Sequence, residues 1–181
     1  FDRDEIDAAI RFGCGPDDGL HSTALAQEWV TPVMTPALAA LYGKPDDLIN
    51  APLIHDDSIN FLRNPVDWAA WFRATDMPAD TTHGSRFSQA DHAIDAALAG
   101  AGVVLARITL AHKDIVEGRL VAPFQTALTT TAKFRFLCPI GHEKRPNVAA
   151  FKSWVLAQSD PIKTFGQDRN FIAAADIPPP Q

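Results

Sequence analysis

Residues 88–106 read SQADHAIDAALAGAGVVLA and contain the clearest pattern of a helix followed by a strand in the chain. It opens with a serine, a residue type that caps helices, and apolar residues then fall on one side of a helix: Ala93, Ala96, Ala97 and Leu98. Gly100 and Gly102 let the chain turn and let the helix pack close to a following strand. The pattern predicts a helix over 88–100 and a buried strand over 102–106.

Other helices and strands alternate around this unit. Short apolar runs bounded by turn residues predict further strands at 8–12, 29–34, 52–55 and 134–139, with a weaker candidate at 120–123. Apolar residues three and four apart predict helices at 65–75, 109–117 and 146–158. The alternation favours an α/β fold with mostly parallel strands. Beyond Ser159 the periodicity is lost, and we expect 160–181 to be a tail.

The composition is that of a folded globular chain. Of 181 residues, 46% are hydrophobic and 21% charged, which excludes disorder as the main state. No apolar run approaches the roughly 18 residues of a membrane helix; the longest candidate, 96–105, is short and rich in Gly and Ala. The first residues, FDRDE, do not resemble a signal peptide. We therefore expect neither a membrane anchor nor secretion.

The charge distribution and the two cysteines limit the classes of function that the chain can have. The net charge is −6, and residues 1–100 hold 6 basic against 16 acidic side chains, while 101–181 hold 10 against 6. The charged residues either form solvated faces of the protein, or the acidic and basic regions meet at an interface. The acidic balance argues that these residues do not grip nucleic acid themselves. Cys14 and Cys138 are expected to be free thiols in a reducing cytoplasm rather than a disulfide or a zinc site.

Motifs for catalysis are largely missing. The loop at 13–19, GCGPDDG, follows a strand, but its spacing and two aspartates argue against a pyrophosphate site, so we expect a hairpin-like loop. His55-Asp56-Asp57-Ser58 follows another strand and includes metal-binding residue types. No second histidine stands at ligand spacing, so orienting a ligand or capping the backbone is the favoured role. We predict no metal, no cofactor and no catalytic residue.

Two features suit a small anion. Arg11 ends a predicted strand, where α/β sheets bind their ligands. Ser88 and Gln89 begin the predicted helix, whose first N–H groups favour negative charge. Together they would suit a small molecule with a carboxylate.

Seven segments, in order, resemble one family. They are IDAAIRFG (6–13), WVTPVMTPAL (29–38), PLIHDDS (52–58), DWAAW (67–71), RF (86–87) followed by GAGVVLA (100–106), GRLVAPF (118–124) and VAAFKSW (148–154). These segments resemble the effector-binding domain of LysR-type transcriptional regulators, in the branch that includes regulators of glycine cleavage and of β-lactamase. The resemblance covers about residues 1–158.

The resemblance implies an α/β, two-lobed fold similar to type 2 periplasmic binding proteins, with two crossover segments. Lobe I would be 1–36 plus 107–159, and lobe II 37–106. Such regulators begin with a winged helix-turn-helix, a linker helix and the first strand and helix of lobe I, none of which is in this sequence. The resemblance therefore also implies an N-terminally truncated domain, a cytoplasmic parent that binds DNA, and a homodimer or tetramer.

The resemblance also implies the site residues. The cleft residues it assigns to effector binding are Arg11, Phe12, Gly13, His55, Asp56, Asp57, Ser58, Phe87, Ser88, Gln89, Ala106, Arg107, Ile108, Phe134 and Phe136. Relatives often place hydroxyl groups where Gln89 and Ala90 stand here. Each aromatic residue can equally well be core packing. The helix over 88–100 would add His92, Asp95, Ala96 and Ala99 to an antiparallel dimer interface.

Two alternatives use the same fold. A periplasmic solute-binding protein would need an upstream signal peptide and would expose its cysteines to an oxidising compartment. An enzyme would need a general base, and His55 is the one plausible candidate. We favour the regulator over both, and expect no enzymatic activity.

Overall fold

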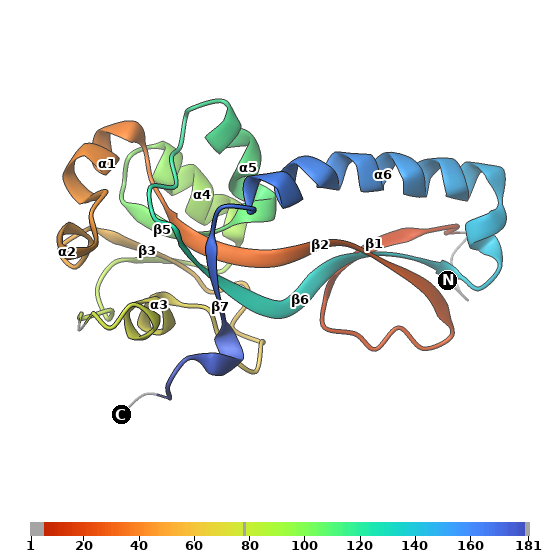
Figure 1. Cartoon of the computed structure of the whole chain (residues 1–181), viewed down its shortest axis with the longest axis horizontal. Helices are drawn as coiled ribbons and strands as arrows, with labels where there is room; N and C mark the ends of the chain where they lie inside the picture. Colours follow the sequence, from red (N-terminus) through yellow and green to blue (C-terminus); the bar gives the residue numbers. More distant parts are fainter. Residues whose placement is uncertain (1–5, 78, 180–181) are drawn as a thin grey trace. The chain divides into compact units, whose positions relative to one another are not determined.

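A computed structural model describes residues 6–77 and 79–179 (Figure 1). The chain forms two compact units: unit 1 is Phe1–Glu28 with Thr131–Gln167, and unit 2 is Trp29–Thr130 with Asp168–Gln181. These boundaries are not those of the predicted lobes, whose division stays a prediction. Strands β2 (Leu20–Val33) and β6 (Thr126–Pro139) each run from one unit into the other.

Unit 1 is built from one long helix on strands. The helix α6 (Pro146–Phe165) follows a short 3₁₀ helix, η1 (His142–Lys144), and strand β1 (Ala9–Gly13) pairs antiparallel with β6. Helix α6 and strands β2 and β6 share one buried cluster of side chains: Leu25, Phe136, Cys138, Val148 and Val155. Because β6 lies between β1 and β2 in the strand order, the loop at 13–19 is not the hairpin-like connection expected.

Unit 2 holds the sheet that carries most candidate residues. Strand β3 (Leu53–Asp56) runs parallel to β4 (Ser85–Phe87) on one side and to β5 (Val103–Arg107) on the other. Strand β5 is antiparallel to β2, whereas β7 (Asn170–Ala173) is parallel to β6. The pairing is therefore mixed rather than mostly parallel.

The helices of unit 2 cover both faces of this sheet. In Figure 1, α1 (Pro36–Tyr42), α4 (Ala90–Leu98) and α5 (Ile108–Val116) lie on one side, and α3 (Trp68–Ala74) on the other. The short α2 (Pro45–Leu48) follows α1, and η2 (Ala174–Asp176) follows β7. The predicted apolar side of α4 is buried against Ile54 and Val104.

Local capping fixes where α3 begins. Asp67 is its N-cap, and the Asp67 Oδ1 accepts the Ala70 N–H at 2.7 Å. Trp68 is buried, and its indole N–H donates to the Ile54 carbonyl at 2.9 Å, which ties the helix to β3. The aromatic spacing that predicted this helix is the spacing that buries Trp68, Trp71 and Phe72.

Most predicted elements are confirmed. The exceptions lie in long strands and at the C-terminal end. Strands β2 and β6 begin at Leu20 and Thr126, well before the predicted starts at 29 and 134. The weak strand at 120–123 is wrong, since Val121 forms only an isolated bridge with Met34. The predicted tail instead continues α6 and then forms β7 and η2.

Two smaller expectations have clear outcomes. Cys14 and Cys138 are both free, as predicted. Ser88 is not the cap of α4: the N-cap is Gln89, which makes no side-chain hydrogen bond to the helix. Within the described residues, no helix is long and apolar enough to cross a membrane.

Gly102→Ala is predicted to be strongly destabilising for a steric reason. A Cβ at Gly102 would lie 2.2 Å from the Pro52 carbonyl oxygen, a backbone atom that cannot rotate away. We expect the free energy of unfolding, measured by urea titration, to fall by about 3 kcal/mol. Gly118→Ala is the control: its φ is +72° and its surroundings are open, so only backbone strain of about 1 kcal/mol is expected. Equal losses would contradict the steric argument.

Candidate functional site

Polar groups meet where the parallel strands of unit 2 end. Strands β3, β4 and β5 are parallel to one another, so their carboxyl ends share one edge of the sheet. Asp56 stands opposite Phe87 in the register, and the Asp57 N–H donates to the Phe87 carbonyl at 2.8 Å. The structure thus brings together three of the predicted segments: 55–58, 87–89 and 106–108.

Asp57 is held by a bidentate ion pair. Arg86 donates from Nε to Oδ2 at 3.0 Å and from Nη2 to Oδ1 at 2.6 Å, and Asn60 donates to Oδ1 at 3.2 Å. Burial raises the pKa of Asp57, but the hydrogen bonds from Arg86 and Asn60 and the Arg86 charge outweigh it, so the pKa lies below its usual value. The carboxylate stays ionised and its orientation is fixed.

Asp56 and Ser58 each have a side-chain oxygen that can still form a hydrogen bond. Asp56 Oδ1 accepts the Ser58 N–H at 2.8 Å. Its Oδ2 and the Ser58 hydroxyl are buried, and neither has a hydrogen-bond partner within the described residues. Buried polar atoms normally find a partner in protein or water. These two atoms are therefore available to a water or a ligand.

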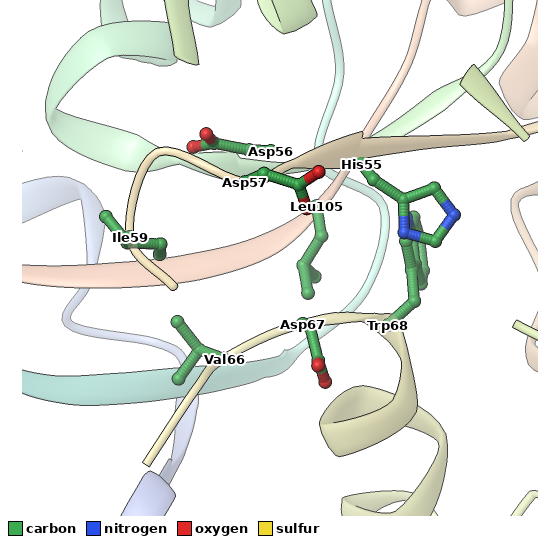
Figure 2. Close-up of a pocket in the computed structure, with 8 residues that line it drawn as sticks. All are labelled: His55, Asp56, Asp57, Ile59, Val66, Asp67, Trp68 and Leu105. Carbon is green, nitrogen blue, oxygen red and sulfur yellow. The ribbon is translucent and has the colours of Figure 1, made fainter. Parts of the chain in front are cut away.

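A small cavity lies beside this turn. Figure 2 shows Ile59 and Val66 facing each other on one side of it, with Leu105 and Asp67 between them and the rings of His55 and Trp68. Its volume of about 10 Å³ is room for roughly one water molecule. An effector does not fit inside this cavity, so any ligand of this edge must lie outside it.

His55 is committed to a structural bond. The residue is 6% exposed, and its Nε2 donates to the His83 carbonyl at 2.9 Å. That nitrogen therefore carries a proton and is not free to act as a base. This bond fixes the ring orientation and leaves Nδ1 as the nitrogen that can accept a proton in the neutral ring. In the described part of the chain, no group of three or more His, Cys, Asp or Glu side chains could hold a metal ion.

The N-terminus of α4 faces the same strand ends. Its N-cap, Gln89, has an extended backbone and leaves the first-turn N–H groups without a side-chain acceptor. Such groups attract anions. One carboxylate, Asp91, stands in that first turn. Ser88 and Gln89 are exposed, while Phe87 is half-buried against the core.

The β5–α5 junction contributes buried residues. Ala106 and Arg107 stand opposite Thr31 and Val30 of β2, and Ile108 begins α5. All three predicted residues here are almost fully buried, Arg107 included at 8% exposure. They support the strand end rather than expose a broad contact surface.

Unit 1 holds the remaining predicted residues. Arg11 is exposed on β1, and Phe12 and Phe134 stand opposite each other with ring centroids 5.0 Å apart. Gly13 ends the strand. Phe136 is fully buried and packs against Phe151, 6.0 Å away, so the structure places it in the core.

Arg135 is a buried charged residue that was not predicted from the sequence. Its side chain is 5% exposed, and its Nη1 donates to Asp17 Oδ2 at 2.6 Å, which also accepts the Ser22 hydroxyl at 2.8 Å. A Cβ at Gly15 would lie 3.1 Å from the guanidinium, so the glycine loop closes around it. The available signal was an arginine between Phe134 and Phe136 in an apolar strand.

Open α/β domains bind small molecules at an edge where parallel strands end beside a helix N-terminus, and this is the class of domain that the fold indicates. Comparison with known proteins identifies the family of this domain. The family described as "LysR substrate binding domain" matches residues 1–160. The chain belongs to this family, whose members are the effector-binding domains of transcription regulators and not enzymes.

Individual relatives agree with this assignment. The chain is 33% identical over 162 residues to the "Glycine cleavage system transcriptional activator" of Escherichia coli K12, covering 86% of the chain and 50% of that protein. It is 28% identical over 157 residues to the "HTH-type transcriptional activator AmpR" of Rhodobacter capsulatus, covering 87% and 52%. The chain thus spans about half the length of these curated relatives.

A solved structure supports the fold. The effector domain of AmpR from Pseudomonas aeruginosa superposes with a TM-score of 0.65 at 26% identity, covering 90% of this chain and 76% of that one. The LysR effector-domain fold, similar to type 2 periplasmic binding proteins, is therefore confirmed.

Arg86→Ala is predicted to raise the pKa of the Asp57 carboxyl toward 3.8. Because the folded pKa is depressed, the ion pair stabilises the protein above the pKa of the unfolded chain and loses that effect as pH falls through the folded value. We expect the variant to be less stable by up to about 1 kcal/mol at pH 7, since the pair is partly exposed. The difference should vanish below Asp57's folded pKa.

The measurement is carboxyl NMR of Asp57 together with urea unfolding from pH 7 to pH 3. Arg63→Ala serves as the control, because Arg63 is an exposed arginine on a neighbouring loop. An Asp57 pKa that is the same in both variants and in the parent would contradict the assigned pairing.

Proposed function

We propose that this chain is the sensory part of a LysR-type regulator and binds a small anionic effector. The family match over residues 1–160 carries the proposal, and the chemistry of the strand ends supports it. In unit 2, first-turn N–H groups of α4 and the Ser58 hydroxyl offer donors, whereas Asp56 Oδ2 can only accept a hydrogen bond and suits a polar donor of the effector rather than its anionic group. In unit 1, exposed Arg11 offers a cation.

The proposed effector contacts are those residues predicted from the sequence that the structure leaves accessible. Ala106, Arg107, Ile108 and Phe136 are almost fully buried and act indirectly, by supporting the strands that carry the others. The effector binds one conformation of the domain better than another and thereby shifts their populations. The parent protein is a cytoplasmic regulator that binds DNA through a helix-turn-helix domain outside this chain. The quoted relatives are transcription regulators, which favours this function over solute transport.

A second copy of the chain is the proposed partner at α4. His92 and Asp95 are exposed on this helix, Ala99 is exposed at its C-cap, and Ala96 is half-buried. Small residues on an exposed helix face allow a neighbouring helix to approach closely. This face therefore suits the dimer, or one interface of a tetramer, that the family resemblance implies.

Arg11→Ala is predicted to weaken effector binding about tenfold, because it removes a charge-assisted hydrogen bond. The chain is titrated with acetate and succinate and with their neutral amides, and binding is measured by calorimetry and NMR. Carboxylates should bind more tightly than the amides and shift the amide signals of Gln89 and Ala90. Arg119→Ala, which removes an exposed arginine elsewhere, should leave affinity unchanged. Amides that bind as tightly as carboxylates would refute an anionic effector, and unchanged affinity in Arg11→Ala would remove Arg11 from the site.

Ala99→Arg is predicted to dissociate the dimer, because it places a long charged side chain on the small-residue face of α4. Sedimentation equilibrium should show the parent chain as a dimer and the variant as a monomer with at least tenfold weaker association. Ala40→Arg on α1 is the matched control, since Ala40 is also an exposed alanine. A variant that still associates as the parent does would refute the α4 interface.

A further inference from the structure

The C-terminal segment 168–179 lies beyond the family match and is part of unit 2. Strand β7 pairs in parallel with β6, and the Asn170 N–H donates to the Gln125 carbonyl at 2.9 Å. The Phe171 ring meets the buried Trp29 edge-on at 5.4 Å. Main-chain bonds and an aromatic contact therefore hold the segment in place.

Two arginines fasten this segment at either end. Arg169 Nη1 donates to the carbonyl oxygens of Ala122 and Phe124. At the other end, Arg73 of α3 donates from Nε to the Pro178 carbonyl at 3.0 Å. Both contacts are made to main-chain atoms, so the path of the segment is fixed on unit 2.

A cavity of ligand size lies between α3 and this segment. Its volume is about 650 Å³, within the roughly 300–1,000 Å³ of small-molecule sites. The segment lines it with apolar side chains, which include Ala174, Ile177 and Pro178. Ala69 and Ala70 of α3 line the opposite wall. An apolar body would therefore be in contact on two sides.

The charges at the cavity favour an anion. Arg63 and Arg73 line it, and within the described residues Arg63 makes no ion pair and Arg73 uses only its Nε. The one carboxylate in the lining, Asp67, has its Oδ1 engaged in capping α3. Free guanidinium N–H groups are the donors that pair best with carboxylates.

We propose that α3 and the C-terminal segment form a second ligand site, for a small organic anion with an apolar body. It is independent of the proposed effector site, since it uses none of the residues assigned there. Its occupant bridges Arg63 and Arg73 and packs on Ile177, so binding also fastens the segment to α3.

The test uses 2-naphthoate and its neutral analogue 2-naphthamide as probes on the complete 181-residue chain, followed by amide NMR and calorimetry. We expect 2-naphthoate to shift the signals of Ala70, Arg73 and Ile177, and 2-naphthamide to bind at least tenfold more weakly. Arg63→Gln should weaken 2-naphthoate binding about tenfold, whereas Arg119→Gln should not change it.

A second variant addresses the wall formed by the segment. Ile177→Glu leaves β7 intact and places a carboxylate in the cavity, so 2-naphthoate binding should be lost while the NMR signals of β7 remain. The proposal is overturned if naphthoate and naphthamide bind equally, if Arg63→Gln binds as the parent does, or if neither probe binds. Shifts confined to Gln89 and Ala90 would also overturn it, because the probe would then occupy the effector site instead.

Discussion

The parallel strands of unit 2 are held in register by close backbone approach on both sides of β3. A Cβ at Gly102, just before β5, would lie 2.2 Å from the Pro52 carbonyl, and a Cβ at Gly84, just before β4, would lie 2.2 Å from the Leu53 carbonyl. Glycine therefore precedes both neighbours of β3 where they pass its first residues. This approach fixes the parallel register, and the register brings three carboxyl strand ends to one edge.

The same edge shows how an acidic region can accept an anion. Asp57 is neutralised by its bidentate contact with Arg86, and His55 is held by a carbonyl. These satisfied groups are rigid, because each has its partner within unit 2. The first-turn N–H groups of α4 keep their capacity for an external ligand. Asp91, which stands in that first turn, opposes an anion at this helix end.

The helices and strands that could be predicted are those in which one kind of burial produces one sequence pattern. Helices α3 and α4 each bury one side, and β3 and β5 are short apolar runs, so spacing was sufficient. The site segment 55–58 was found because polar residues follow such a run. Its partners were not predictable, since the contact between Asp57 and Arg86 joins residues from different strands. Arg135 was missed for the same reason: its partner, Asp17, is far away in sequence.

The two long strands were underestimated because their environment changes along their length. In β2, burial alternates up to Ala24 and then becomes nearly continuous from Leu25 to Val33. The sequence of such a strand alternates in its first part and is continuously apolar in its second part. Only the apolar part is recognisable as a strand from the sequence. Both strands cross from one unit to the other, and β7 adds to β6 in unit 2 only. The C-terminal segment therefore acts on the half of β6 that also carries Thr126, whose carbonyl accepts the Thr31 hydroxyl of β2. A ligand that fastens this segment would stabilise the strands that continue into unit 1.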